Sequence, residues 1–392
     1  MDHSKEELTE AKRQIDSTIS KLNAVIGTLG AKDEPQRYRS QLTLAKRRVK
    51  AFSLASELIA RELESGDPVD PRGSTVQKGD IHMAELVCLG ELLIDFTPCG
   101  LSEAGNLCYE RNPGGAPANV AAAAARLGLG AAFIGKVGDD LHGRFLRRTL
   151  KDEGVDVSGL RLDGGTSTSL AFVELGPDGE RDFSFVRRGC GDTLLRPEEI
   201  PAELIRRAKI LHLGTLSMTE EPARSATAWA LTLAAAAGVT VSCDVNYRAP
   251  LWDSKKAFLH ACDALLPRVN LLKVSLEEAV LLTGTSQPER AAEAIKSRWG
   301  VGTVAVTLGA EGAWLDGYCP AFPAQAVDTT GAGDCFWAAW LYARLRQRSD
   351  ALPFACAAAS LCVEKRGAIP SMPTLTEVED KLKSDPLRCA PT

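Results

Sequence analysis

The residues best suited to chemistry lie in one short stretch, residues 328–334, with the sequence DTTGAGD. An Ala- and Trp-rich segment with helical spacing follows it, so we expect a loop that opens a helix. Gly331, Ala332 and Gly333 can turn backbone N–H groups toward one point, where the helix dipole favours a phosphate in transfer. The carboxylate of Asp334 would then take a proton from an attacking hydroxyl. The alternative is an ordinary helix N-terminus, at which Asp334 only matches the dipole.

A second candidate segment is residues 112–121, with the sequence NPGGAPANVA. Gly114 and Gly115 permit close backbone approach, and Asn119 stands on the first turn of a predicted helix. Its amide offers the donor and the acceptor that a sugar hydroxyl needs, although an ordinary helix start would look similar. Asp95 follows an apolar strand near the edge where open α/β sheets bind ligands, so it would either bind a polyol or close a turn.

These two segments resemble the paired signatures of the ribokinase-type (PfkB) sugar kinases. DTTGAGD resembles the C-terminal signature, and the GG pair followed by Asn119 and by residues 133–143 resembles the N-terminal one, in the order that the family has. Residues 244–252 resemble the DPNxRxxLW segment of fructokinases and 2-keto-3-deoxygluconate kinases, with Val245 where Pro is usual. The chain is therefore identified as similar to fructokinases, which implies a ribokinase-like three-layer α/β sandwich with a small β-sheet lid.

The resemblance also implies an activity. It is the ATP-dependent phosphorylation of a sugar hydroxyl, with D-fructose to fructose 6-phosphate as the expected reaction and with ATP, Mg²⁺ and K⁺ as cofactors. Asp334 would be the base, and Gly331–Gly333 would form the anion hole. A 2-keto-3-deoxygluconate kinase and a catalytically silent sugar-binding sensor are the alternatives. A sensor has no need of the base, so the presence of Asp334 counts against it.

Site residues follow from the same resemblance. The expected sugar ligands are Asp95, Gly114, Gly115, Asn119, Arg187, Arg248 and Asp334. The expected ATP-binding residues are Lys273, Ser275, Glu278, Thr307, Gly309, Gly312, Gly333, Cys356 and Ser360. Glu278 would act on Mg²⁺ through water, and Asp328 with the carbonyl of Thr330 would bind a monovalent cation. Ser275 stands where the family has Asn, and without the resemblance Ser275 and Glu278 read as a helix capping box.

Composition limits the other classes of function. The 392 residues are 45% hydrophobic and 25% charged, enough for one domain of about 300 residues and a small extra one. The net charge of -5 argues against nucleic acid as the main partner. No apolar run reaches the ~18 residues of a membrane span, and the N-terminus lacks the apolar core of a signal peptide. With eleven cysteines and no CxxC pair, we expect reduced thiols in a cytoplasmic protein.

The N-terminal part differs from the rest of the chain. In residues 1–64, apolar residues recur at intervals of three, four and seven residues, which predicts two helices folded back as a hairpin. Residues 65–83 have no periodicity and are expected to be a linker. The hairpin is either a native accessory or oligomerisation element, or a partner fused by cloning. We favour fusion slightly, because residues 71–74 (PRGS) resemble a cleavage linker and residues 81–83 (IHM) a cloning scar.

Residues 84–385 are expected to form the sugar kinase domain. Strand and helix patterns alternate there, which predicts βαβ units and a mostly parallel sheet. Lid strands are expected within residues 108–115 and 166–194, where short alternating segments flank a Gly-Pro-Asp-Gly turn. Lids of this family commonly pair between subunits, so the resemblance implies a homodimer. The expected partners are a sugar and ATP, with no nucleic acid and no membrane.

Overall fold

The computed structural model describes residues 5–30, 84–175 and 181–384, together with Val49, Phe52 and Ser56. The chain divides into two compact units, Met1–Ile81 and His82–Thr392. None of the helices within the described residues is long and apolar enough to cross a membrane. All cysteines among these residues are free thiols.

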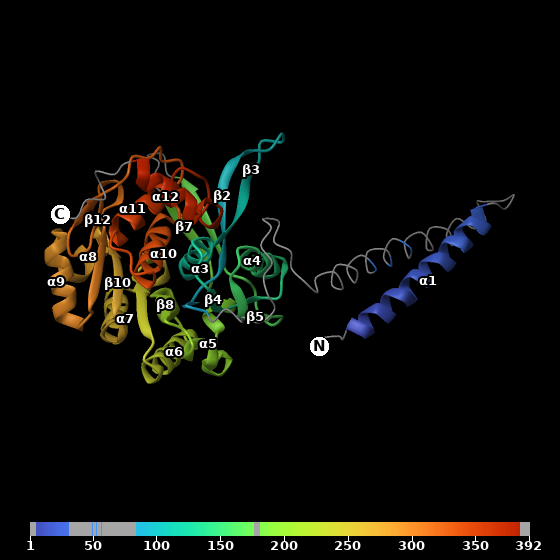
Figure 1. Ribbon diagram of the computed structural model, residues 1–392, viewed down its shortest axis with the longest axis horizontal. Helices are drawn as coiled ribbons and strands as arrows, with labels where there is room; N and C mark the ends of the chain where they lie inside the picture. The colour runs from blue at the N-terminus through green and yellow to red at the C-terminus, as the bar shows by residue number, and fades with distance from the viewer. Residues whose placement is uncertain are drawn as a thin grey trace. The chain divides into compact units, whose positions relative to one another are not determined.

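The described part of the first unit is mainly one helix, α1 (Lys5–Gly30), shown in blue in Figure 1. Its apolar residues recur at helical spacing, as the first half of a hairpin requires. Ser56, which is also helical, donates a hydrogen bond from Oγ to Asp16 Oδ1 at 2.5 Å. Most of the expected second helix and all of the expected linker up to residue 83 lie outside the described residues. The boundaries of hairpin and linker therefore stay predictions.

The second unit is built on a nine-stranded sheet, within the part of the chain that is described. Its strands are, in spatial order, β13 (Tyr318–Pro320), β12 (Gly312–Trp314), β11 (Thr303–Thr307), β10 (Leu271–Ser275), β9 (Thr240–Asp244), β8 (Ile210–Gly214), β1 (Leu86–Leu89), β4 (Ala131–Gly138) and β5 (Asp156–Asp163). All neighbouring strands from β11 to β5 pair in parallel, whereas β12 and β13 join antiparallel at one edge. The predicted parallel sheet is therefore confirmed.

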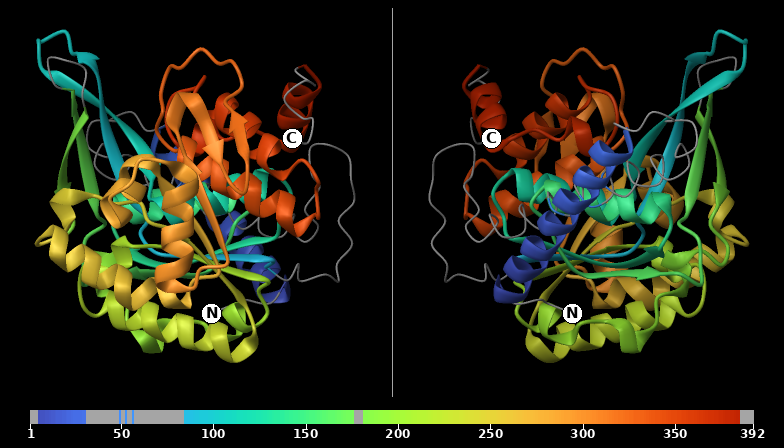
Figure 2. Two further views of the ribbon diagram at one scale, coloured as in Figure 1. Left: turned by 90° about the vertical axis from the view of Figure 1, so that its left-hand side faces the viewer. Right: turned by 90° about the vertical axis from the view of Figure 1, so that its right-hand side faces the viewer.

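Helices cover both faces of this sheet (Figure 2). One hydrophobic core includes α3 (Ala116–Arg126), α4 (Leu141–Asp152), α10 (Ala332–Leu345), α11 (Ala351–Cys362) and α12 (Leu375–Ser384). The other includes α5 (Ala202–Arg206), α6 (Ala223–Ala237), α7 (Lys255–Leu265), α8 (Leu276–Thr283) and α9 (Pro288–Trp299). Successive residues of β1 alternate between the two cores, since side chains of a strand point to opposite faces. This gives the expected three-layer α/β sandwich.

A separate four-stranded sheet has the order β3-β2-β6-β7. It consists of β2 (Leu93–Leu101), β3 (Leu107–Gly114), β6 (Leu170–Leu175) and β7 (Arg181–Val186), and β2 and β3 project from the sandwich in Figure 1. The predicted antiparallel pairing of β6 with β7 is confirmed, while the turn at residues 176–180 lies outside the described residues. One expectation is corrected: Asp95 lies in β2 of this small sheet, opposite Asn112, and not at the end of a central strand.

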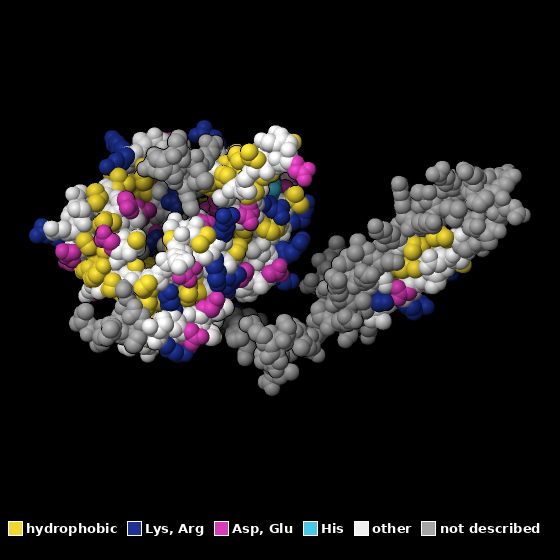
Figure 3. All heavy atoms as spheres, turned by 90° about the horizontal axis from the view of Figure 1, so that it is seen from above, with side chains coloured by type: hydrophobic (Ala, Val, Ile, Leu, Met, Phe, Trp, Pro, Cys, Tyr) yellow, Lys and Arg dark blue, Asp and Glu magenta, His cyan; other side chains and the backbone are white. Residues whose placement is uncertain are grey.

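The surface of the second unit carries no single dominant charge on the face seen in Figure 3. Lys and Arg side chains are interspersed there with Asp and Glu side chains.

Candidate active site

A cavity of ≈ 380 Å³ lies where the small sheet meets the carboxyl ends of the central strands. Ligands of open α/β sheets bind at this edge. The predicted site residues that line it are Asp95, Gly115, Asn119, Arg248, Lys273, Ser275, Glu278, Thr307, Asp328, Thr330, Gly331, Gly333 and Asp334. Residues far apart in the sequence are therefore brought together around one space.

Asp334 lies in the first turn of α10 and is 9% exposed. Gly331 is the N-cap of this helix, with φ 80°, and a Cβ there would lie 2.9 Å from the Cβ of Ala368, so only glycine fits. Asp334 Oδ2 accepts a hydrogen bond from Asn119 Nδ2 at 2.8 Å. Burial and the nearby charge of Asp244 raise the pKa of Asp334 to about 6. A carboxylate with this pKa is a suitable base near neutral pH.

Lys273 is a buried cation of the site and lies in the middle of β10. Its Nζ donates to Asp244 Oδ2 at 2.8 Å. A Cβ added to Gly333 would lie 2.7 Å from this Nζ, so the ammonium group lies directly against the start of α10. Burial alone would lower the pKa of Lys273, but the charges of Asp244, Glu278 and Asp334 outweigh it and raise the pKa. Lys273 therefore stays protonated beside the helix N-terminus.

Asp95 enters the cavity from β2. Burial raises the pKa of its carboxyl to about 7, although the charge of Arg248 opposes the rise. A Cβ on Gly114 would overlap Asp95 Oδ2, which explains the glycine in the neighbouring strand. Gly114 thus makes room for Asp95 without lining the cavity itself.

Ser275 and Glu278 form the capping box that the sequence pattern alone predicts. Ser275 Oγ accepts from Glu278 N at 3.2 Å, and Glu278 Oε2 accepts from Ser275 N at 2.8 Å. Glu278 Oε1 accepts from Tyr247 N at 2.6 Å, so both of its oxygens hold backbone N–H groups. Burial raises the pKa of Glu278. Both side chains still line the cavity, so the structural interpretation does not exclude a ligand.

The loop before α10 is held by Asp328. Its Oδ1 accepts from Thr330 N at 2.9 Å and from Thr330 Oγ1 at 2.7 Å, and its Oδ2 accepts from Gly367 N at 3.0 Å. Within the described residues, no group of three or more His, Cys, Asp or Glu side chains is arranged to hold a metal ion. A divalent ion here would need phosphate oxygens or water as most of its ligands.

Arg187 was expected to bind the sugar, but the structure places its side chain outside this cavity. Its Nε donates to Asp192 Oδ2 at 2.7 Å, its Nη1 to Thr219 Oγ1 at 2.7 Å and its Nη2 to the carbonyl of Leu216 at 2.9 Å. The side chain is 3% exposed and does not line the cavity. The guanidinium group is used within the protein, because it ties the end of β7 to the sandwich.

Several other expected residues lie away from the cavity lining. They are Gly309, Gly312, Ala332, Cys356 and Ser360. Ser360 donates to the carbonyl of Ala357 at 2.7 Å and Cys356 is 4% exposed, so neither side chain of α11 faces this space. The N–H of Ala332 donates to the carbonyl of Thr329 at 3.3 Å, so it is already used within the loop. Of the three residues expected to form the anion hole, Gly331 and Gly333 line the cavity.

Some lining residues were not predicted. They are chiefly Glu91, Thr97, Asn112, Asn246 and Gly367. Asn246 has the left-handed φ of 44°, a strained conformation that Asn tolerates better than most residues. Asn112 and Asn246 lie inside the recognised segments, residues 112–121 and 244–252, and that position is the signal by which they could have been found.

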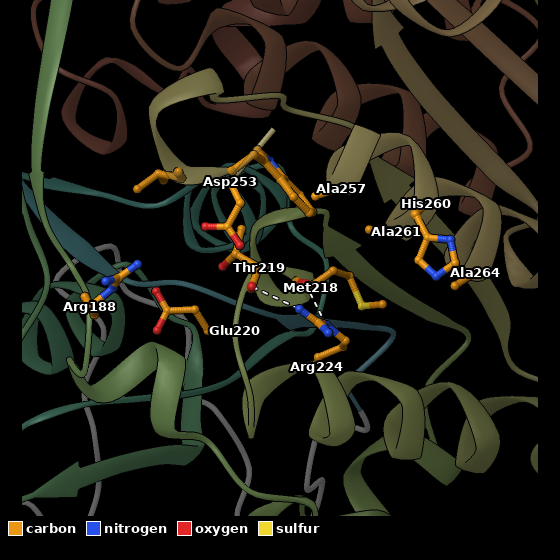
Figure 4. Close-up of a pocket in the computed structure, with 12 residues that line it drawn as sticks. Arg188, Met218, Thr219, Glu220, Arg224, Asp253, Ala257, His260, Ala261 and Ala264 are labelled. Atoms are coloured by element: carbon orange, nitrogen blue, oxygen red, sulfur yellow. Dashed lines mark hydrogen bonds between the residues drawn. The ribbon is translucent and has the colours of Figure 1, made fainter. Parts of the chain in front are cut away.

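A second cavity, of ≈ 590 Å³, lies between η4 (Leu216–Met218), η5 (Ala249–Leu251) and α7 (Figure 4). Arg224 donates to the carbonyls of Met218 at 2.9 Å and Thr219 at 3.0 Å, and His260 comes from α7. This space is larger, but it contains none of the predicted site residues. The smaller cavity combines a buried acid, a buried cation and a helix N-terminus, which are groups that phosphoryl transfer can use.

The three-layer fold and this site define a sugar kinase of the ribokinase-like class, and solved structures agree. A fructokinase from Xylella fastidiosa with bound ATP matches with a TM-score of 0.69 and 31% identity, covering 77% of this chain and 99% of that one. A fructokinase from Vibrio cholerae O395 with bound fructose, ADP and calcium ion matches with a TM-score of 0.70 and 32% identity, over 77% and 99% of the two chains.

Sequence comparison identifies the family. Residues 83–375 match the model of the pfkB family carbohydrate kinases. Fructokinase-1 of Oryza sativa subsp. japonica is 41% identical over 317 residues, which are 76% of this chain and 98% of that protein. The chain belongs to the pfkB family and is a carbohydrate kinase, so the resemblance drawn from the two signatures is confirmed.

Proposed function

We propose that this protein phosphorylates D-fructose at its primary hydroxyl, using ATP, to give fructose 6-phosphate. The observation that carries the proposal is the buried carboxylate of Asp334, which is bonded to Asn119 and lies at the start of α10 beside Lys273. The relatives named fructokinases, at 41% identity over most of their length, support fructose as the acceptor.

The charge of the cavity supports a neutral sugar. Five carboxyl side chains line it, those of Glu91, Asp95, Glu278, Asp328 and Asp334. The cations among the described lining residues are Arg248 and Lys273, and Lys273 is already paired with Asp244. A carboxylate-bearing sugar would need cations aimed at it, and the guanidinium of Arg187 is engaged elsewhere. A 2-keto-3-deoxygluconate kinase is therefore the weaker candidate.

In the proposed reaction, Asp334 takes the proton of the attacking hydroxyl. Asn119 Nδ2 donates to this carboxylate and orients it. The Oδ1 atom of Asn119 has no hydrogen-bond partner among the described residues, so it can accept from a sugar hydroxyl. Asp95 and Gly115 would orient the same sugar, with Arg248 at its side. Backbone N–H groups at Gly331 and Gly333 and the ammonium group of Lys273 would stabilise the charge that develops on the phosphoryl group.

The residues present fit ATP with Mg²⁺. Lys273, Thr307 and Gly333 line the cavity beside the helix N-terminus, where phosphates are favoured. Glu278 would bind a hydrated Mg²⁺ through water, in addition to holding its backbone N–H groups. When bound, Mg²⁺ would neutralise phosphate charge. Asp328 and the Thr330 carbonyl would hold K⁺, and a double mutant of the Vibrio cholerae fructokinase has been solved with a potassium ion.

The small sheet would act as a lid that excludes water from the reaction, since water would otherwise compete as the nucleophile. Strands β2, β3 and β7 of this sheet expose large apolar side chains, with Leu101 70%, Leu107 51% and Val186 54% exposed. Pairing of two such sheets would cover these side chains, which supports the proposed homodimer.

The test is an ADP-release assay with ATP and Mg²⁺ across fructose, 2-keto-3-deoxygluconate, ribose, glucose and adenosine. Both the full chain and a chain that starts at Met83 are assayed. Turnover with fructose, similar in both proteins, would support the proposal and make the N-terminal hairpin dispensable for catalysis. Turnover with the acid sugar alone would favour the alternative kinase, and turnover with none of the substrates would favour a sugar sensor.

A further inference from the structure

Glu91 is a buried acid of the catalytic cavity to which the proposed reaction assigns no role. It follows β1 directly after Gly90, is 3% exposed and lines the cavity. Its Oε1 accepts a hydrogen bond from the backbone N–H of Ala116 at 3.1 Å. Its Oε2 is buried without a hydrogen-bond partner among the described residues. A buried carboxyl that is only half satisfied costs stability, so its presence here calls for a functional reason.

The contact with Ala116 places Glu91 at the N-terminus of α3. Gly115 is the N-cap of this helix and makes no side-chain capping bond. A Cβ on Gly115 would overlap the carbonyl oxygen of Glu91, so this position must be glycine and cannot supply a cap of its own. Glu91 supplies the missing acceptor from elsewhere in the chain, and a carboxyl group at this end also matches the helix dipole.

The same short loop contacts α3 a second time. A Cβ on Gly90, which has φ 154°, would lie 2.6 Å from Cγ of Pro117, the second residue of the helix. The loop therefore packs against the first turn of α3 through both its backbone and the side chain of Glu91. The position of that turn depends on this loop.

The first turn of α3 carries the sugar-facing groups. Asn119 donates its backbone N–H to the carbonyl of Gly115 at 2.9 Å, which closes the turn. Its side chain reaches Asp334 Oδ2 at 2.8 Å. A path of direct contacts thus runs from Glu91 through the first turn of α3 to the carboxylate of the proposed base.

We propose that Glu91 is a positioning residue for the acceptor sugar, because its hydrogen bond to Ala116 fixes the turn that presents Gly115 and Asn119. This inference rests on the proposed sugar kinase reaction. Glu91 acts through α3 and does not take part in proton transfer.

The hydrogen bond, not the negative charge, is the feature that acts. Burial raises the pKa of Glu91 to about 7, although its backbone hydrogen bonds, that from Ala116 included, and the charge of Arg187 lower it. A proton on the unpartnered Oε2 leaves Oε1 free to accept from Ala116. Glutamine has the same shape as this protonated form, so Glu91→Gln should keep the contact.

The experiment compares Glu91→Gln with Glu91→Met, which fills a similar volume without an acceptor, and with Glu91→Asp, which keeps the charge but is too short to reach. KM for fructose, KM for ATP and kcat are measured for each variant with saturating co-substrate. Unfolding temperature and fructose binding by calorimetry are measured on the same samples. Asp140→Ala is the control, because Asp140 is the N-cap of another helix, α4, where it accepts from the N–H groups of His142 and Gly143; it also accepts from Thr168 and does not line the cavity.

Loss of a charge-assisted or buried hydrogen bond corresponds to a change of about tenfold or more. We expect KM for fructose to rise by about this factor in Glu91→Met and Glu91→Asp, and to stay within about threefold of the parent in Glu91→Gln. KM for ATP should stay within about twofold in all of them. Asp140→Ala should lower the unfolding temperature without changing KM for fructose.

An unchanged KM for fructose in a folded Glu91→Met or Glu91→Asp protein would overturn the inference. A Glu91→Gln protein as impaired as Glu91→Asp would overturn it as well. If Glu91→Met fails to fold, the inference is tested by comparing KM for fructose between Glu91→Gln and Glu91→Asp. Failure of the parent protein to use fructose would instead overturn the proposed function, so the two failures are distinguishable.

Discussion

Replacing Asp334 by asparagine should separate the catalytic role of this residue from its effect on the free energy of unfolding. Asparagine keeps an oxygen that can accept from Asn119, so the sugar-binding groups should stay in place. A positioned general base contributes about 10² to 10⁴ in rate, which corresponds to ~3 to 5 kcal/mol of transition-state stabilisation. We therefore expect kcat to fall by about 10² to 10⁴, with KM for fructose within about threefold of the parent.

The same substitution should stabilise the folded protein at high pH. Burial and the charge of Asp244 raise the pKa of Asp334 from 3.8 to about 6, so the folded protein binds this proton more tightly than the unfolded chain does. The resulting decrease in the free energy of unfolding is absent below pH 3.8, grows between pH 3.8 and about 6, and is constant above that. A rise of about two pKa units corresponds to ~3 kcal/mol, which Asp334→Asn should recover at pH 8.

Two measurements check this pair of effects. Turnover is followed by ADP release with fructose, and the free energy of unfolding is obtained from urea titrations at pH 4 and pH 8. Asp334→Ala is the comparison, since it also removes the acceptor for Asn119 and should raise KM for fructose. A kcat of Asp334→Asn above a tenth of the parent value would refute the role as base. A stability gain that is equal at both pH values would refute the burial argument.

Three further predictions follow from the site. The kcat/KM for fructose should rise with pH as Asp334 ionises, because burial raises its pKa to about 6 and only the carboxylate can take the proton; a profile that stays flat through about pH 6 would contradict this. Lys273→Met should destabilise the protein by about 3 to 5 kcal/mol in urea unfolding, because the buried Asp244 loses its partner, and adding Asp244→Asn should restore much of the loss. Arg187→Ala should lower the unfolding free energy by a similar ~3 kcal/mol, since its buried ion pair is broken, whereas a change confined to KM for the sugar would point to a direct sugar contact.

The contrast between Arg187 and Arg248 shows where prediction of the site from sequence reached its limit. Both arginines follow strands and were expected to contact the sugar, yet only Arg248 lines the cavity. Arg187 is buried because Asp192, Thr219 and the Leu216 carbonyl lie within reach of its three donor nitrogens. Asp192 is only five residues away, but Thr219 and Leu216 lie about 30 residues further along the chain, so the sequence around residue 187 does not show that all three donors are used.

Asp95 and Glu91 show the same limit for strands. A short acidic and apolar run predicts that the chain passes close to the sheet edge, but it does not show which sheet it joins. The structure pairs Asp95 with Asn112 in the small sheet, and it turns Glu91 back to the N-terminus of α3. Both outcomes depend on partners distant in the sequence.

Local sequence determined the parts of this protein that depend on local chemistry. The apolar runs predict the buried strands, the glycines at 331 and 115 predict close approach and helix starts, and the two signatures predict the family. Only the tertiary structure decided which polar groups share one cavity, which donors are satisfied elsewhere, and that Lys273 lies against Gly333. The physical reason is that periodicity and turn chemistry act between near neighbours, whereas burial, pKa values and hydrogen-bond partners are set by elements that meet only in the folded chain.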